Sequence, residues 1–184
     1  RSLRNVAHRR AAELAARADS PLRPPAMDDL RVPIISLPAE ILCADGETVQ
    51  GEVFLPAQSA RQPGPMPPDE WVESVHVFFP VRSTKTRALT IVNRDTVVAI
   101  TVPAAANCVH DDELVDLPVF WVAVDAGGRR FEGDIVVDMP PGHQRVADWL
   151  NAAPPFLTLR SGLTHHLIHK RHVLRVLELE RMSA

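Results

Sequence analysis

The chain of 184 residues has few aromatic residues, a small net charge and no long apolar run. It has no tyrosine, and aromatic residues make up only 5% of it, which argues against a platform that stacks bases. The net charge of −3 provides no global basic field for nucleic acid or anionic lipid. No window approaches the roughly 18 uncharged apolar residues that a transmembrane helix needs.

Cysteine is also scarce. Cys43 and Cys108 are the two cysteines, too few for a disulfide framework. Cys43 lies in a strand pattern and is expected to be a small core residue, whereas Cys108 lies in a predicted linker, so we expect no bridge. No signal peptide is visible, although the chain begins at Arg1 rather than Met, so targeting is not readable. We expect a cytoplasmic protein, or one on the cytoplasmic face of a membrane-associated assembly.

The main positive signal is an internal duplication. The run VADWLNAAPPFLTLRSG (146–162) has a diverged counterpart, EWVESVHVFFPVRST (70–84). Three residue pairs match at one offset of 78: Trp71 and Trp149, Phe78 and Phe156, Arg82 and Arg160. The glycine spacing 46–51 recurs as 128–133, and IVNRDTVVAITV recurs as LIHKRHVLRVLE at an offset of 76. The offset between matching residues is 82, 78 or 76, and it changes only in the predicted loops, where insertions and deletions are tolerated. This pattern predicts two diverged copies of one unit.

Each copy predicts the element order ββαβββ. A hairpin with an Asp45-Gly46 turn opens the first copy, and one with a Gly127-Gly128 turn opens the second. Short helices follow, the first capped by Asp69 and the second at 143–151 with Asn151 as its C-cap. The remaining strands are expected at 77–82, 87–93 and 96–102, and at 155–160, 163–169 and 172–179.

The predicted organisation has four parts. A helical arm and linker occupy 1–33, the first module 34–103, an acidic linker 104–118 and the second module 119–184. The arm is a helix over 2–18, either a solvated segment or a docking helix. The acidic run between the modules is expected to be a solvated connector.

The fold class is mainly β. Five short strands are too few for a sandwich, and an open sheet would leave unprotected edges, so closure into a small barrel is expected. Gly51 and Gly133 fall in mid-strand, where a barrel needs a bend or a close approach of backbones. The helix should plug one barrel mouth through Trp71 or Trp149. We therefore predict two tandem five-stranded SH3-like or Sm-like barrels behind an N-terminal helix.

Four segments of the second module, EGDIVVDMP, RVADWLN, FLTL and HKRHVLRV, carry a further similarity. The module resembles an uncharacterised bacterial small-barrel domain family whose members read EG-x-V-x-x-P, R-L-S-D-F-L-N, F-L-P-L and N-K-R-H-I. The first module departs from it, because its helix lacks Asp-x-Leu-Asn and NRDTV replaces NKRHI. The resemblance covers about 60 residues and implies a fold and a bacterial source, but no catalytic residues.

Four histidines, His165, His166, His169 and His172, invite a metal interpretation. However, His165 and His166 should point to opposite faces of a strand, and Lys170 and Arg171 oppose a cation. The matching positions of the first module hold no ligand set. We predict a basic, solvent-facing turn and no metal site.

No constellation of an enzyme is visible. Ser83 and Ser161 follow arginine at strand ends, where turn chemistry explains them, and the glycine turns lack the long helix of a phosphate cradle. We predict no catalytic residue and no cofactor.

With metal and catalytic sites set aside, the remaining candidate sites are surfaces for contact with another chain or between the modules. On the last strand, Leu174 and Val176 should face inward, and the outer side should carry an apolar stripe that either packs the modules together or binds another chain. The predicted contact residues are Leu3, Val6, Arg10, Leu14, Lys170, Arg171, Val173, Arg175, Leu177 and Leu179.

The sequence thus predicts a non-enzymatic adaptor or structural subunit of a larger bacterial assembly, or a homo-oligomer. The alternative is an Sm-like RNA-binding protein that uses the basic turn around Lys170 and Arg171 together with the basic arm.

Overall fold

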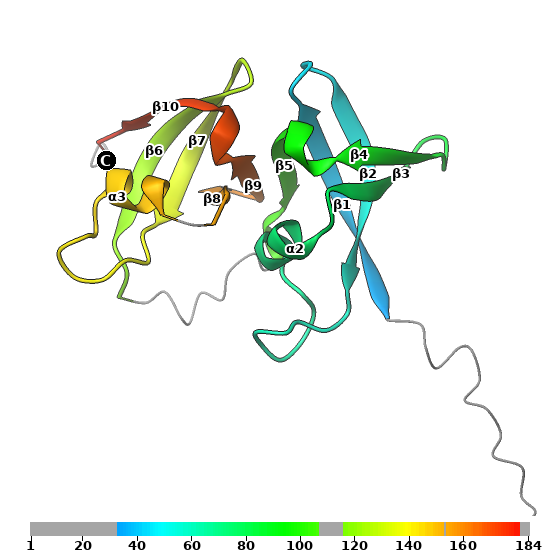
Figure 1. The fold of residues 1–184 in the computed structure, drawn as a ribbon, viewed down its shortest axis with the longest axis horizontal. Helices are drawn as coiled ribbons and strands as arrows, with labels where there is room; N and C mark the ends of the chain where they lie inside the picture. The colour runs from blue at the N-terminus through cyan, green and yellow to red at the C-terminus, as the bar shows by residue number, and fades with distance from the viewer. Residues whose placement is uncertain (1–32, 107–115, 153, 181–184) are drawn as a thin grey trace, which may run out of the picture. The chain divides into compact units, whose positions relative to one another are not determined.

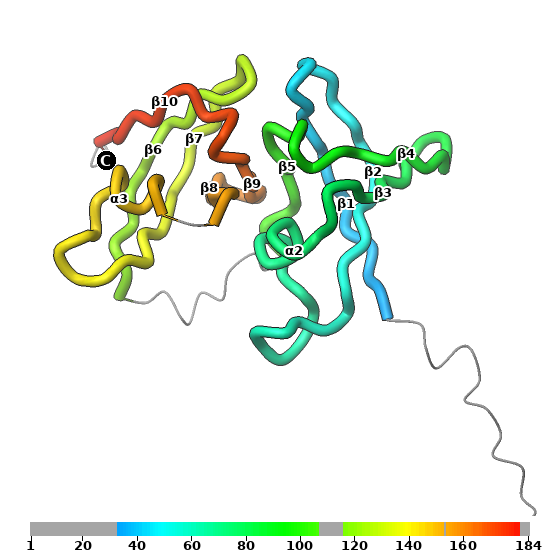
Figure 2. The backbone as a smooth tube through the Cα atoms, viewed as in Figure 1, coloured from blue at the N-terminus to red at the C-terminus, as the bar shows by residue number. Residues whose placement is uncertain are grey.

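A computed structural model describes residues 33–106, 116–152 and 154–180 of the chain, all within one compact unit, Pro33–Ala184. The protein is mainly β: ten antiparallel strands form one sheet, accompanied by two short α-helices in the described residues (Figures 1 and 2). The predicted helix over 2–18, Cys108 and three of the four acidic residues of the linker lie outside the described residues, and the fourth, Asp116, is exposed.

The first half of the sheet comprises β1–β5. Along the chain, helix α2 follows the second strand and precedes the third (Figure 1). A 3-10 turn, η2, connects the fourth strand to the fifth. The bounds are β1 Ile34–Cys43, β2 Thr48–Pro56, α2 Pro68–Ser74, β3 Phe78–Ser83, β4 Leu89–Asn93, η2 Arg94–Thr96 and β5 Val97–Pro103.

The second half comprises β6–β10, in the same element order. The bounds are β6 Val119–Ala126, β7 Arg129–Val136, α3 Val146–Asn151, β8 Phe156–Ser161, β9 Thr164–His169, η5 Lys170–His172 and β10 Val173–Glu178. The strands predicted by residue range begin and end within two residues of these bounds. Both hairpin turns lie where the glycines predict them, at Gly46 and at Gly127-Gly128, all with positive φ.

The strands follow the order β10-β6-β7-β8-β9-β5-β1-β2-β3-β4. In each half the last strand therefore lies beside the first. The halves are joined by β5 and β9, which pair antiparallel over five residue pairs, from Ala99 opposite Ile168 to Pro103 opposite Thr164. The sheet is open in its hydrogen bonding, with β10 and β4 at its two ends, and closure of each half into a barrel stays a prediction.

Two hydrophobic clusters fill the interior, one for each half. The first contains side chains of β1–β5 together with Trp71 and Val72 of α2, and the second contains side chains of β6–β10 together with Val146 of α3. Each cluster also takes side chains from the other half. Phe156 and Leu167 pack in the first, and Leu42, Val98 and Ala99 pack in the second. The two cores are thus interlocked across the β5–β9 junction.

Gly51 and Gly133 are confirmed as points of close backbone approach. A Cβ on Gly51 would lie 2.4 Å from the carbonyl oxygen of Arg82, and one on Gly133 would lie 2.2 Å from that of Arg160. The Gly51–Arg82 and Gly133–Arg160 pairs are matching positions of the two halves. A side chain there would push the third strand of the half away from the second.

The helices differ from the prediction at their ends. Pro67, not Asp69, is the N-cap of α2, because the chain enters the helix through Pro67 and Pro68. Ala152, not Asn151, is the C-cap of α3. Trp71 is buried in the first core, with its ring edge-on to Phe79, whereas Trp149 is only half-buried against the second.

Candidate functional site

The junction between β5 and β9 has specific side-chain contacts besides its ladder. His166 Nδ1 lies 2.9 Å from the Thr101 hydroxyl, and His172 Nε2 lies 3.2 Å from the carbonyl oxygen of Asp95. Arg129 reaches from the second half to the first and donates to Glu40 at 3.3 Å and to the Thr48 hydroxyl at 2.9 Å. The two halves are therefore joined by side-chain contacts as well as by the backbone hydrogen bonds between β5 and β9.

The histidine cluster belongs to this junction, and the prediction of a solvent-facing turn is wrong for His169. His169 is buried, and its ring stacks on Phe156 with centroids 4.4 Å apart. Burial, reinforced by nearby His172 and Arg171, lowers the pKa of His169 to about 4, and burial lowers the pKa of His166. Among the described residues, no group of three His, Cys, Asp or Glu side chains is arranged to hold a metal ion.

Lys170, a predicted contact residue, lies at the end of a helix and donates to its carbonyl oxygens. Its ammonium donates to the carbonyl oxygens of Trp149 and Ala152 at 3.2 and 2.7 Å, at the C-terminal end of α3, and lies 5.0 Å from the Trp149 ring centre. Burial lowers the pKa of Lys170. A cation at a helix C-terminus satisfies carbonyl oxygens that have no partner within the helix.

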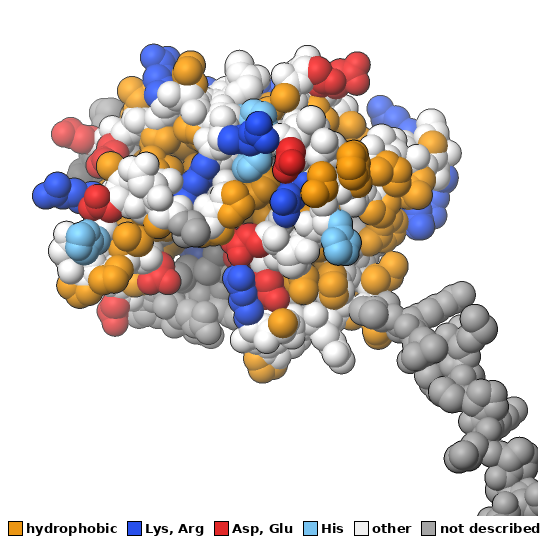
Figure 3. Space-filling view, in the orientation of Figure 1, with side chains coloured by type: hydrophobic (Ala, Val, Ile, Leu, Met, Phe, Trp, Pro, Cys, Tyr) orange, Lys and Arg blue, Asp and Glu red, His pale blue; other side chains and the backbone are white. Residues whose placement is uncertain are grey.

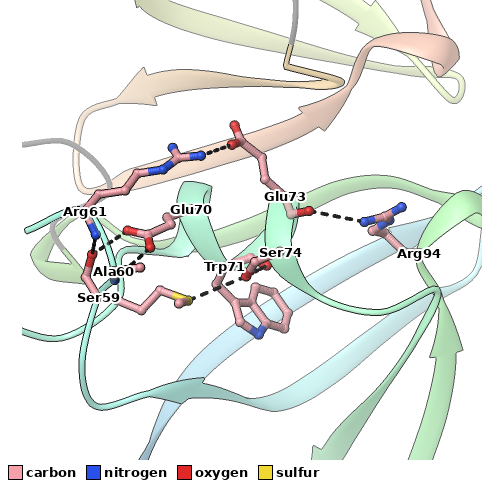
Figure 4. A network of polar contacts seen from close by, with 9 residues as sticks. Ser59, Ala60, Arg61, Glu70, Trp71, Glu73, Ser74 and Arg94 are labelled. Carbon is pink, nitrogen blue, oxygen red and sulfur yellow. Dashed lines mark hydrogen bonds and ion pairs between the residues drawn. The ribbon is translucent and has the colours of Figure 1, made fainter.

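The matching residue of the first half, Arg94, does the same for α2. Its guanidinium donates to the carbonyl oxygen of Val75 at 2.9 Å and to that of Glu73 at 3.5 Å. Figure 4 shows Arg94 beside the helix end. Arg94 begins η2 and Lys170 begins η5, and each binds the C-terminal end of the helix in its half, an interaction called the helix clamp below. Sequence reasoning missed this role, although the two residues match at an offset of 76.

A buried carboxylate holds the other side of α2. Glu70 accepts hydrogen bonds from the Ser59 hydroxyl at 2.6 Å and from the backbone N–H of Ala60 at 3.2 Å, and Arg61 pairs with Glu73 at 3.0 Å (Figure 4). These contacts attach the proline-rich loop to the helix. The network is satisfied by the protein itself, so its role is structural.

The outer face of β3 and β4 is apolar and exposed. Phe78 and Pro80 of β3 stand opposite Asn93 and Ile91 of β4, and Leu89 continues the same face. Three large hydrophobic side chains of this face are exposed, Phe78, Leu89 and Ile91, and Val77, just before β3, is exposed as well. Hydrophobic side chains gather over β3 and β4 in Figure 3. One edge of β4 has no strand partner among the described residues.

The second edge without a strand partner in the described part of the chain is that of β10, where the predicted facing of one residue, Leu174, is wrong. The β10–β6 register shifts between Val173 and Arg175, so Leu174 is an extra residue in a bulge and is exposed rather than inward. Val176 packs on the second core as predicted, but Val173 does so as well. Below, the term free edges refers to two surfaces. One is β4 and the adjoining β3 with the exposed residues Phe78, Leu89 and Ile91, and the other is β10 with the exposed residues Leu174 and Leu177.

The other predicted contact residues on this strand have defined places. Arg175 donates to the Asp125 carboxylate on the neighbouring strand, and Leu177 is exposed. The backbone N–H of Leu179 donates to the Trp121 carbonyl oxygen at 2.8 Å. Arg171 is exposed. Leu3, Val6, Arg10 and Leu14 lie outside the described residues.

A pocket of about 440 Å³ brings together charged residues of both halves, including Arg61, Asp69, Glu73, Asp138 and Arg160. Burial raises the pKa of Asp69 to about 6, and its Oδ1 has no hydrogen-bond partner among the described residues. A carboxyl with this pKa becomes protonated as the pH falls through about 6. A second pocket, of about 290 Å³, is mainly apolar and lies between the start of β1 and the proline-rich loop. Sequence reasoning identified neither pocket.

Cys43 is a free, half-buried thiol. Burial, with Asp45 and Glu47 nearby, raises its pKa, which disfavours the reactive thiolate. Ser83 is engaged in its turn, where its hydroxyl accepts from the N–H of Thr86 at 3.2 Å. Neither side chain is arranged as an activated nucleophile.

Comparison with protein-family models, with curated proteins and with solved structures found no match for this chain. In the described part of the chain, no helix has the length and apolar character needed to cross a bilayer. Function must therefore be argued from the geometry of the described residues.

Proposed function

We propose that the protein is a non-enzymatic structural subunit or adaptor of a larger bacterial assembly, built from two diverged copies of a small SH3-like or Sm-like barrel. The shared element order, the matching strand order and the paired glycine contacts at Gly51 and Gly133 support the duplication. A cytoplasmic location is part of the proposal and is consistent with the free thiol of Cys43.

The observation that carries the proposal is the contrast between the internal junction and the free edges. Inside the molecule, β5 and β9 join through backbone hydrogen bonds and buried apolar side chains. At the free edges the same kinds of side chain are exposed, and no strand of the described ranges pairs with the outer backbone edge. A strand edge of this composition is a template for pairing with another chain.

The RNA-binding alternative receives less support. The ammonium of Lys170, its central residue, is committed to the carbonyl oxygens of α3, and His169 is buried against Phe156. Phosphate recognition requires accessible cations, and of this turn Arg171 is the exposed one. A salt titration of binding to single-stranded RNA tests this alternative; steeply salt-dependent binding would favour it over the proposal.

The proposal is tested by chemical cross-linking in the native source, followed by purification of the protein. Ile91→Glu or Leu174→Glu should reduce the cross-linked species, because each places a charge on one free edge. Leu163→Glu is the matched control, because Leu163 is at least as exposed as Ile91 and Leu174 but lies in the turn between β8 and β9. Unchanged cross-linking in both edge variants contradicts a contact function of the free edges.

A further inference from the structure

We infer that the protein binds a second copy of itself head-to-tail, with β10 of one copy paired antiparallel to β4 of the next. This pairing repeats between chains the β5–β9 pairing that joins the two halves within a chain. The inference rests on the proposed contact function and names its partner.

The first argument comes from the third and fourth strands of each half. Phe156 and Leu167 are 4% and 0% exposed, and both pack in the core of the other half. Their counterparts Phe78 and Ile91 are 60% and 59% exposed. The counterparts occupy the same ladder positions, since Ile91 stands opposite Pro80 as Leu167 stands opposite Thr158. The apolar surface that β9 buries at the junction is thus present on β4, where nothing within residues 33–106, 116–152 and 154–180 covers it.

The second argument comes from the last strands. Both contain a register shift at the same place: one residue, Val98 in β5 and Leu174 in β10, stands between two ladder pairs. Val98 is 1% exposed because the β6–β7 turn covers it; a Cβ on Gly127 would lie 2.7 Å from its side chain. Leu174 is 84% exposed. It projects toward the place where the corresponding turn of another copy, at Asp45-Gly46, would lie.

The internal ladder also fixes the register. Ile100 stands opposite Leu167, Thr101 opposite His166 and Val102 opposite His165. Carried over at the offset of 76, these pairs place Val176 opposite Ile91, Leu177 opposite Thr90 and Glu178 opposite Leu89 of the next copy. No like charges oppose each other in this register, and the aliphatic side chains of Val176 and Ile91 meet.

The two surfaces in this contact are different, so the contact is heterologous. Each added copy presents a new free β4 or β10, and the series ends only when a ring closes; otherwise it continues as a filament. Either product contains an even number of halves, because every chain contributes two.

The first test is the native mass of the purified full-length chain and its variants. The wild-type protein should have a mass of two or more times 20.3 kDa. Ile91→Glu and Leu174→Glu should each give the mass of a single chain, with an unchanged circular dichroism spectrum. Leu163→Glu should keep the wild-type mass. A wild-type mass of one chain at every concentration overturns the inference, and so does an edge variant that keeps the oligomer.

The register is tested by disulfide trapping in a Cys43→Ala/Cys108→Ala background. The pair Thr90→Cys and Leu177→Cys should form covalent multimers on oxidation, because the matching internal pair, Thr101 and His166, has side chains in hydrogen-bond contact. The pair Ala88→Cys and Leu177→Cys, displaced by two residues along the same face, should form few or none. Equal trapping in both pairs, or trapping in the displaced pair alone, overturns the proposed register.

The two proposals fail in different ways. If the wild-type chain is a single chain in solution but loses partners in the native source when Ile91 or Leu174 is changed, self-association is wrong and the contact function stands. If the edge variants keep every partner and every mass is unchanged, both are wrong.

Discussion

Strands β4 and β9 occupy the same place in the two halves of the sheet, yet β4 is largely exposed and every residue of β9 is half-buried or buried. The difference arises from their neighbours, because β9 has β5 beside it and β4 has no strand beside its outer edge among the described residues. Their sequences remain similar in apolar character: Leu-Thr-Ile-Val-Asn in β4 matches His-His-Leu-Ile-His in β9. We propose that this apolar edge, which no described residue covers, is kept for contact with a partner rather than adapted to solvent.

The largest expected effect is a contrast between Phe156→Ala and Phe78→Ala. Phe156 fills space in the interlocked cores, so its truncation should lower the free energy of unfolding by about 3–5 kcal/mol. Phe78 is mostly exposed in the single chain, so its truncation should cost less than about 1 kcal/mol there. Chemical unfolding, measured in the Ile91→Glu background to keep the chain single, provides both values. Equal losses would mean that the two positions have the same environment.

The two mid-strand glycines should behave alike. Gly51→Ala and Gly133→Ala each place a Cβ within 2.4 Å of a carbonyl oxygen, and we expect each to lower the free energy of unfolding by roughly 2–4 kcal/mol. Gly46→Ala is the control, because its positive φ strains alanine but a Cβ there meets nothing within 4 Å, so it should cost roughly 1 kcal/mol. A loss at Gly51 or Gly133 no larger than that at Gly46 would contradict the close approach of backbones.

The helix clamps should also be equivalent. Lys170→Met and Arg94→Met remove the cation from the C-terminal end of α3 and α2, respectively, and each should cost roughly 1–2 kcal/mol. Arg171→Met changes an exposed neighbour of Lys170 and should cost less than about 0.5 kcal/mol. Thermal unfolding monitored by near-ultraviolet circular dichroism distinguishes these values. If Arg171→Met were as costly as Lys170→Met, the clamp would not be specific to Lys170.

The smallest predicted effect concerns pH. The pKa of His169 is lowered to about 4 in the folded state, so below about pH 6.5 the unfolded chain binds more protons at this residue. His169 therefore makes the free energy of unfolding fall as pH decreases from about 6.5 to about 4. His169→Asn, which copies Asn93 of the first half, should make this fall shallower when unfolding midpoints are compared between pH 7 and 5.

Asp69 changes stability in the opposite direction. Its raised pKa of about 6 favours the folded state as pH decreases toward the ordinary value of 3.8. This effect is common to the wild type and to His169→Asn, so the difference between them isolates His169. Identical pH profiles would contradict a neutral, buried His169.

Local pattern was sufficient to predict the strands, the hairpin turns and the role of Gly51 and Gly133, because alternation and glycine placement are properties of the chain itself. The facing of Leu174 could not be predicted, since a bulge shifts the alternation by one residue and no turn residue marks it. The helix start at Pro67 was missed because Asp69 is the more usual cap type.

Contacts between residues far apart in the sequence could not be predicted from local sequence pattern. Nothing in LIHKRH indicates that Lys170 reaches α3 or that His169 stacks on Phe156, because both contacts require the tertiary fold. The stripe on the last strand was one candidate for joining the modules, but β5 and β9 join them instead. Comparing the two matched strands in the structure, rather than either sequence alone, identifies the free edges.

The most direct test of the central claim is to mix Ile91→Glu with Leu174→Glu in equal amounts. The first variant keeps an intact β10 and the second an intact β4, so one complementary pair of edges remains. Native mass spectrometry should then show a heterodimer of about 40.6 kDa, twice the 20.3 kDa of each chain, although each variant alone is a single chain. A mixture that remains at 20.3 kDa would contradict head-to-tail pairing of β10 with β4.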